Sequence, residues 1–200
     1  LLELGKKYKE THPDYFIIFR SLNKKINRSL IDSLLERGYT LIPSRQVYLF
    51  DCNSPDVFDR KNTKHDLRLM KKSLFKVVEA DLFSDEDYKR AEELYGMLYL
   101  EKYSSLNPAF TAKYLKLCQE TKIMKIQGLF SKENVMEGVV GYFIINKIMS
   151  VPIVGYNTKL PQSLGLYRQL ILLAFLYARE HKLFLNLSSG ASAYKRYRGG

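Results

Sequence analysis

Tryptophan is absent from the 200-residue sequence, and cysteine and histidine are scarce, with two and three residues. Cys52 and Cys118 stand far apart, with no Cys-x-x-Cys pair and no cluster of histidines. Structural zinc sites take four Cys or His ligands at close spacing, so this pattern argues against a metal site. It also argues against a disulfide scaffold, and it favours a cytosolic, reducing environment.

Long apolar runs are also missing. The longest uninterrupted run covers residues 170–178, whereas a helix that spans a bilayer needs about 20 apolar residues. Residues 1–10 are amphipathic and charged, unlike a secretory signal peptide. We therefore expect no membrane span. Because the chain does not begin with methionine, we expect it to be a piece of a longer protein.

What is present suits a folded domain with an anionic partner. Hydrophobic residues make up 46% of the chain, which is enough for a full core. The formal net charge of +11 favours a nucleotide-bearing cofactor, an RNA or an acidic polymer as partner. A surface that is merely rich in lysine is an equal alternative. The 15 tyrosines predict many half-buried rings whose hydroxyl groups find partners.

The beginning of the chain predicts a strand, a helix and a strand pair. Residues 14–20 form an apolar, β-favouring run. Residues 29–37 carry leucine and isoleucine at helical spacing and end before Gly38, a residue typical of helix C-termini. Residues 39–42 and 46–50 are predicted strands, separated by a proline.

A helical middle region is predicted for residues 53–121. It starts with a polar, basic loop and a short helix over residues 53–75. Ser84, followed by three acidic residues, predicts the N-terminus of a helix that runs to residue 101. A second helix is predicted over residues 108–121.

The last part of the chain predicts an antiparallel meander of three strands, then a helix, a strand and a helix. These elements cover residues 122–130, 135–145, 147–156, 163–181, 183–187 and 191–198, in this order. We therefore predict one α/β (α+β) domain over residues 1–200. Its central sheet is expected to be mixed, largely antiparallel and flanked by helices.

Residues 148–179 carry the clearest signal of a site. A strand ends, a short loop follows, and a helix begins with Gln162, Ser163 and Gly165 in its first turn. Backbone N–H groups at a helix N-terminus lack intrahelical partners and lie at the positive end of the dipole, so they favour phosphate. Arg168 adds positive charge. The alternative is that Gly165 serves only close packing.

This loop resembles the pyrophosphate loop of the GNAT superfamily of acyltransferases, Gln/Arg-x-x-Gly-x-Gly/Ala. Residues 162–167 match it, except that Tyr167 replaces the final small residue. Residues 185–199 resemble the next GNAT segment, with Ser188 at a matching position. Their Tyr-Lys-x-x-Arg-Gly form is nearer to the Fem-type peptidoglycan aminoacyl transferases. The resemblance implies a GNAT-like fold with its cofactor-binding core in residues 122–200.

The resemblance implies that an acyl-coenzyme A is the cofactor and that its pantetheine lies along the strand edge at residues 151–156. It implies that Tyr194, in the last helix, is the acid that protonates the leaving thiolate. The residues that it implies for cofactor binding are Val151, Ile153, Val154, Gln162, Ser163, Leu164, Gly165, Leu166, Tyr167, Arg168, Ser188 and Lys195.

A general base and an acceptor site are expected as well. Glu101 is the catalytic base that we predict, with Asp66 and Glu137 as further candidates, and a solvated surface carboxylate is the alternative for each. Asn186 stands within an apolar strand, where a buried amide needs partners from a ligand or from the backbone. The residues expected to bind the acceptor are Tyr103, Tyr156, Asn157 and Asn186.

Three functions fit this pattern. The first is transfer of an acyl group from acyl-coenzyme A to an amine acceptor. The second is Fem-type transfer of an aminoacyl group from tRNA to a cell-wall precursor, which the charge of +11 favours. The third is a GNAT-like binding module without catalysis, which Tyr167 favours.

GNAT folds continue past their last helix into a further strand pair, which this chain does not contain. We therefore expect either a missing C-terminal segment or a homo-oligomer that completes the sheet, because an open sheet edge invites association.

Overall fold

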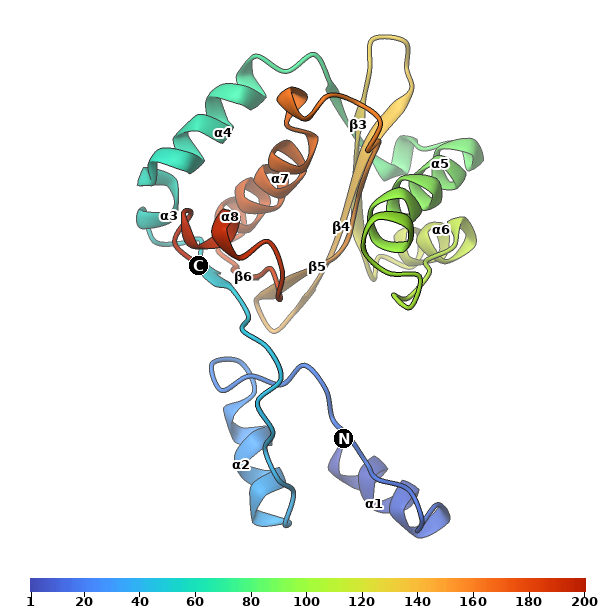
Figure 1. Cartoon of the computed structure of the whole chain (residues 1–200), viewed down its shortest axis with the longest axis vertical. Coiled ribbons are helices and arrows are strands. Elements are labelled where there is room, and N and C mark those ends of the chain that lie inside the picture. The colour runs from blue at the N-terminus through green and yellow to red at the C-terminus, as the bar shows by residue number, and fades with distance from the viewer. The chain divides into compact units, whose positions relative to one another are not determined.

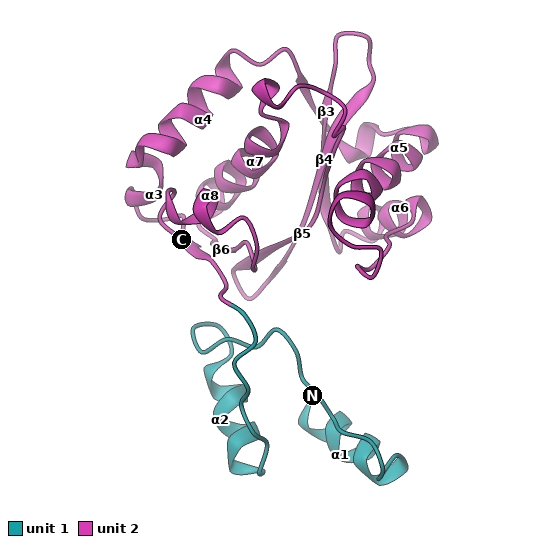
Figure 2. Cartoon of the chain, in the orientation of Figure 1, with its two compact units in different colours: residues 1–45 teal, residues 46–200 magenta.

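The computed structural model describes residues 1–200, which form two compact units, Leu1–Arg45 and Gln46–Gly200 (Figure 2). The single domain that the sequence predicts for residues 1–200 stays a prediction. No helix in either unit reaches the length and apolar character that crossing a bilayer requires.

The first unit contains two helices, α1 (Leu2–Thr11) and α2 (Arg28–Glu36). The predicted end of α2 is confirmed, because Gly38 has a φ of 81°. The amide of Gly38 donates to Leu35 O and that of Tyr39 to Leu34 O, which closes the last turn as a Schellman motif.

The strands predicted for residues 14–20 and 39–42 are wrong, since both segments are irregular. A β-favouring composition forms a strand only where a neighbouring strand takes up its backbone hydrogen bonds. No strand pairs with residues 14–20, and the ring of Phe16 is 97% exposed. The sequence carries the local preference for a strand but not the partner.

The second unit is built on a six-stranded sheet in the order β1-β6-β5-β4-β3-β2. Neighbouring strands are antiparallel, except that β5 and β6 run parallel. The strands are β1 (Leu49–Asp51), β2 (Lys76–Glu79), β3 (Lys125–Phe130), β4 (Met136–Ile145), β5 (Ile148–Tyr156) and β6 (Phe184–Asn186).

The predicted meander is confirmed as β3, β4 and β5. Asn146 and Lys147 join β4 to β5 with φ values of 50° and 63°, as a two-residue hairpin turn requires. Strand β2 was not predicted. It is a short edge strand whose side chains are exposed or half-buried. An edge strand with few buried side chains gives little periodicity from which to predict it.

Helices cover both faces of this sheet (Figure 1). On one face lie α5 (Asp85–Gly96) and α6 (Ala112–Glu120). On the other lies the apolar helix α7 (Leu166–Glu180), with α4 (Lys61–Lys71) packed against it. The shorter helical elements are α3 (Asp56–Asp59), η1 (Ala80–Leu82), η2 (Met97–Tyr103), η3 (Gln162–Leu164) and α8 (Ser192–Arg196).

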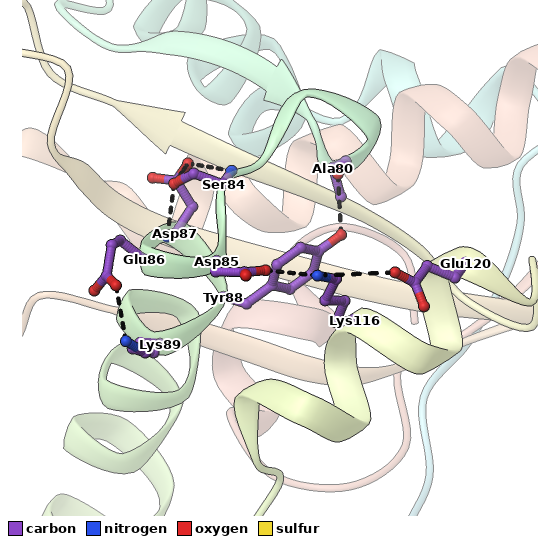
Figure 3. Close-up of polar contacts among 9 residues, drawn as sticks. All are labelled: Ala80, Ser84, Asp85, Glu86, Asp87, Tyr88, Lys89, Lys116 and Glu120. Atoms are coloured by element: carbon purple, nitrogen blue, oxygen red, sulfur yellow. Dashed lines mark hydrogen bonds and ion pairs between the residues drawn. The ribbon is translucent and has the colours of Figure 1, made fainter.

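The predicted start of α5 is confirmed in atomic detail (Figure 3). The amide of Asp87 donates to Ser84 Oγ at 3.2 Å, and Asp87 Oδ2 accepts from the Ser84 amide at 2.8 Å. This capping box satisfies two donors reciprocally. Lys116 on α6 bonds Asp85 at 2.6 Å, which joins the two helices at their solvent side.

Helix α5 then continues into the π-helix η2 and lies very close to β5. A Cβ atom on Gly155 would stand 2.5 Å from Tyr95 N and 2.6 Å from Leu94 C. These contacts are with backbone atoms, which cannot rotate away. Gly155 therefore sets how closely α5 covers the strand.

The C-terminal segment is held by buried cations. Lys195 is 4% exposed, and its Nζ donates to Leu187 O and Ser189 O, both at 2.7 Å. Burial lowers the pKa of Lys195 to about 8. Arg198 is 5% exposed and lies over the Tyr194 ring at 3.6 Å. These contacts fasten α8 to the loop that follows β6.

Gly155→Ala tests the close approach of α5 and β5. The added methyl must displace helix backbone, so we expect a loss of about 2–3 kcal/mol in the free energy of unfolding, measured with urea. Gly96→Ala is the matched control: nothing lies within 4 Å of its added Cβ, and alanine favours a helix by up to about 1 kcal/mol. Equal stability of Gly155→Ala and the wild type would contradict the packing described.

Lys195→Met tests the burial of the ammonium group. Its pKa falls from 10.5 to about 8 on folding, so within this window the unfolded chain holds a proton that the folded chain has lost. The contribution of Lys195 to stability therefore rises with pH across the window and is lowest below it. We expect the stability advantage of the wild type over Lys195→Met to grow between pH 7 and pH 10. An advantage that does not change with pH would refute this.

Candidate functional site

Strand β5 changes its neighbours along its length. It pairs with β4 as far as Tyr156, but with β6 only over Ile148–Ser150. From Val151 to Tyr156, the side of β5 that faced β6 has no strand partner. A parallel pair that parts in this way leaves a row of backbone donors and acceptors along one edge.

A bulge marks the point where β6 leaves. The pairing of β4 with β5 moves from Phe143↔Ser150 to Gly141↔Ile153, so Val151 and Pro152 stand opposite Tyr142 alone. Proline has no N–H and occurs within sheets at bulges and open edges. Pro152 is therefore a sequence signal for the end of the β5–β6 pairing, which was not predicted.

The loop after β5 is held by Glu137 on β4. Asn157 Nδ2 donates to Glu137 Oε2 at 2.8 Å, and the Asn157 amide donates to Glu137 O at 3.0 Å. Arg90 on α5 pairs with the same carboxylate at 3.4 Å. Glu137 is thus not a solvated surface carboxylate. Its Oε2 accepts from Asn157 and pairs with Arg90, so this carboxylate positions the loop.

A pocket of about 200 Å³ lies where the open edge, this loop and the start of α7 meet. It brings together many of the residues predicted for cofactor and acceptor, and it adds four residues that were not predicted: a lysine, a threonine, a leucine and a proline. The lining residues are Lys102, Tyr156, Asn157, Thr158, Leu160, Pro161, Gln162, Gly165, Leu166, Tyr167 and Arg168.

The start of α7 provides backbone donors. The amides of Leu164 and Gly165 are used within the turn η3, at 3.1 and 2.9 Å. The first bond of the helix ladder is from the Gln169 amide to Gly165 O, so the three amides before it belong to the first turn and have no backbone acceptor. All three, on Leu166, Tyr167 and Arg168, belong to residues that line the pocket.

Gly165 has a conformational and a packing reason to be glycine. Its φ is 62°, in the left-handed region. A Cβ there would stand 2.6 Å from Leu69 Cδ2 on α4. Close packing, the alternative given for Gly165, therefore explains this glycine. The glycine by itself does not indicate a phosphate-binding site.

Arg168 bonds a buried acid. Its Nε lies 2.6 Å from Asp66 Oδ1, and Arg198 Nε lies 2.6 Å from Asp66 Oδ2. Asp66 is 1% exposed, so the prediction of a solvated surface carboxylate is wrong. Because both of its oxygens accept guanidinium hydrogens, Asp66 is not a base for a substrate.

Three tyrosines follow one another from the strand edge to the last helix. The Tyr156 and Tyr167 ring centroids are 6.4 Å apart, and those of Tyr167 and Tyr194 are 5.1 Å apart. Burial raises the pKa of Tyr194 and Tyr167 well above the usual range. The Tyr194 hydroxyl is buried and has no hydrogen-bond partner in the protein.

Other predicted residues lie outside this group. Glu101 and Tyr103 are on the exposed side of η2, Tyr103 with 61% of its surface exposed. Asn186 is half-buried, and its Oδ1 accepts from the Ser188 amide at 2.9 Å, so the backbone supplies its partner. Lys195 bonds the carbonyls described above. These side chains do not line the pocket.

No protein-family model matches the chain, and no curated protein sequence matches it. Solved structures match its fold. FemX matches with a TM-score of 0.69 at 11% sequence identity, over 98% of this chain and 72% of the FemX chain. L-PGS from Bacillus licheniformis matches with a TM-score of 0.63 at 18% identity, over 94% of this chain and 56% of that chain.

At these identities the likeness shows the fold. The chain spans 72% of one of these structures and 56% of the other, so both contain further chain beyond the matched part. The predicted GNAT-like fold near the Fem-type branch is confirmed, as is its mixed, largely antiparallel sheet flanked by helices.

Proposed function

We propose that this protein transfers an acyl group from a phosphate-bearing carrier to an amine acceptor. The observation that carries the proposal is the break between β5 and β6, which opens the strand edge from Val151 to Tyr156 directly beside the pocket at the start of α7. An extended carrier arm can pair with such an edge as an added strand does. Phosphate groups then meet first-turn amides and Arg168.

Acyl-coenzyme A is the carrier proposed first. Its pantetheine amides match the donors and acceptors along Val151, Ile153 and Val154, and its pyrophosphate matches the pocket end with Lys102 and Arg168. When bound, the thioester supplies an activated carbonyl. The protein's part is to align that carbonyl, to exclude water and to provide a proton for the departing group.

Tyr194 is the proposed proton donor. Its raised pKa keeps the hydroxyl protonated at neutral pH, and the hydroxyl has no partner in the protein. A buried donor without a partner costs roughly 1–3 kcal/mol, and a ligand atom that accepts from it removes that cost. Attack by a neutral amine forms the new C–N bond, and the bond to the carrier breaks. The leaving atom takes its proton from the Tyr194 hydroxyl, and the proton that the acceptor nitrogen loses restores that hydroxyl. No carboxylate is proposed as the base.

Aminoacyl transfer from tRNA is the second candidate. Tyr167 supports it, because its ring stands where the GNAT pyrophosphate loop has a small residue. This ring packs between Tyr156, which is tilted against it, and Tyr194, which meets it edge-on. The fold shared with FemX supports it too. Aromatic rings beside Lys102 and Arg168 suit a terminal nucleotide of RNA, since bases stack on aromatic side chains.

A titration with two donors distinguishes these candidates. If acetyl-coenzyme A is the donor, we expect it to raise the thermal midpoint, because a ligand at 100 times its Kd stabilises the fold by about 2.7 kcal/mol. No stabilisation at millimolar acetyl-coenzyme A excludes it. For an aminoacyl-tRNA, affinity is expected to fall steeply as salt rises. If neither donor binds, the proposed transfer is excluded, and a non-catalytic binding module is the function that remains.

Tyr194→Phe tests the proton donor. Removing an unpartnered hydroxyl should leave stability equal or slightly higher, while kcat falls by about 100-fold at unchanged donor affinity. The matched control is Tyr197→Phe, next to the same helix but 66% exposed, which should change neither quantity. Unchanged kcat in Tyr194→Phe would remove Tyr194 from the mechanism.

A further inference from the structure

We propose that Asp66 is a positioning residue that acts through Arg168 to form an anion subsite for phosphate or pyrophosphate in the pocket at the start of α7. The proposal rests on the proposed function only for its choice of pocket. Asp66 itself touches no ligand, because it lies behind Arg168 with a side chain only 2% exposed.

Asp66 holds one side of the Arg168 guanidinium. Asp66 Oδ1 bonds Arg168 through Nε at 2.6 Å, and the terminal nitrogens of Arg168 have no protein partner. A guanidinium is planar with five donors in a fixed fork, so holding Nε sets the direction of the other four. The Arg168 side chain is 39% exposed and lines the pocket. The same side chain is thus anchored at one end and open at the other.

The lining of the pocket is positively charged. Its lining holds two cations, Lys102 and Arg168, and no carboxylate. The first-turn amides of α7 add further donors there. An oriented guanidinium beside backbone amides matches the paired oxygens of phosphate groups. An uncharged or cationic ligand finds no comparable partner at this end.

Arg198 keeps Asp66 in place. Its other oxygen, Oδ2, accepts from Arg198 Nε at 2.6 Å. Arg198 in turn lies 3.6 Å over the Tyr194 ring and donates to Tyr194 O at 2.8 Å. With both oxygens engaged, the Asp66 carboxylate has one orientation. Helices α4 and α7 and the C-terminal residue Arg198, which follows α8, therefore meet at a single rigid group.

Positioning and plain charge predict opposite results. Removing the negative charge of Asp66 makes the pocket more positive, so charge alone would tighten anion binding. Releasing Nε lets the guanidinium of Arg168 leave its direction, so positioning predicts weaker binding. The sign of the change in Asp66→Asn decides between them.

The experiment measures binding of inorganic pyrophosphate by calorimetry at constant ionic strength. In the wild type we expect binding, and in Arg168→Gln a loss of about tenfold or more. In Asp66→Asn we expect a loss of about fivefold to tenfold, and in the double variant no loss beyond that of Arg168→Gln. Tighter or unchanged binding in Asp66→Asn overturns the proposal. So does a further loss in the double variant, which would indicate a merely structural role.

A control and a second variant complete the test. Exposed Arg68→Gln removes one positive charge from α4 without touching the Asp66–Arg168 bond, so its binding should stay within about twofold of the wild type. If Asp66→Asn does not fold, Arg168→Lys decides. It keeps the charge but loses Nε, so about tenfold weaker binding supports the proposal and equal binding overturns it.

Acetyl-coenzyme A, measured in parallel, separates this proposal from the proposed function. Pyrophosphate binding with the expected pattern but no binding of acetyl-coenzyme A leaves the anion subsite standing and removes that donor. Binding of both ligands with no effect of Asp66→Asn removes the positioning role and leaves the function. No pyrophosphate binding in the wild type removes the subsite.

Discussion

The structure of the second unit depends on where the backbone hydrogen bonds of β5 find partners. Up to Ser150 the strand has a neighbour on each side, and beyond it the side toward β6 is open. Pro152 lacks an N–H, and the bulge that holds it absorbs the change of direction. An open edge in the middle of a sheet is unfavourable unless other groups cover it. At the end of this edge, the loop after β5 and the start of α7 form the pocket.

The second organising feature is the buried carboxylate of Asp66 between two arginines. Taking the charges of Asp66 and Arg198 out of water is costly, and apolar side chains of similar volume often stabilise a fold as well or better. Such a cluster is therefore weak as an explanation of stability. It is a better explanation of orientation, because it joins α4, α7 and the segment after α8 through bonds with defined directions.

Much of the site was predictable because its residues are neighbours in the chain. The loop over residues 157–168 carries most of the pocket lining, and turn residues, a glycine and a helix start are all local signals. The other contributions come from far away in sequence: Asp66 is 102 positions before Arg168, and Glu137 is 20 before Asn157. Single-sequence patterns do not register such pairs, so neither partner was predicted, and both carboxylates stood as candidate bases or surface carboxylates.

The sequence by itself determined the meander, the capping box at Ser84 and the apolar helix α7, because short-range hydrogen bonding and periodic burial specify each of them. It did not determine the conformation of residues 14–20, which favour a strand by composition but have no neighbouring strand to pair with. Nor did it show that Lys195 is an internal donor. Those outcomes belong to the tertiary structure, since a strand or a buried charge is defined by groups that the chain brings back from a distance.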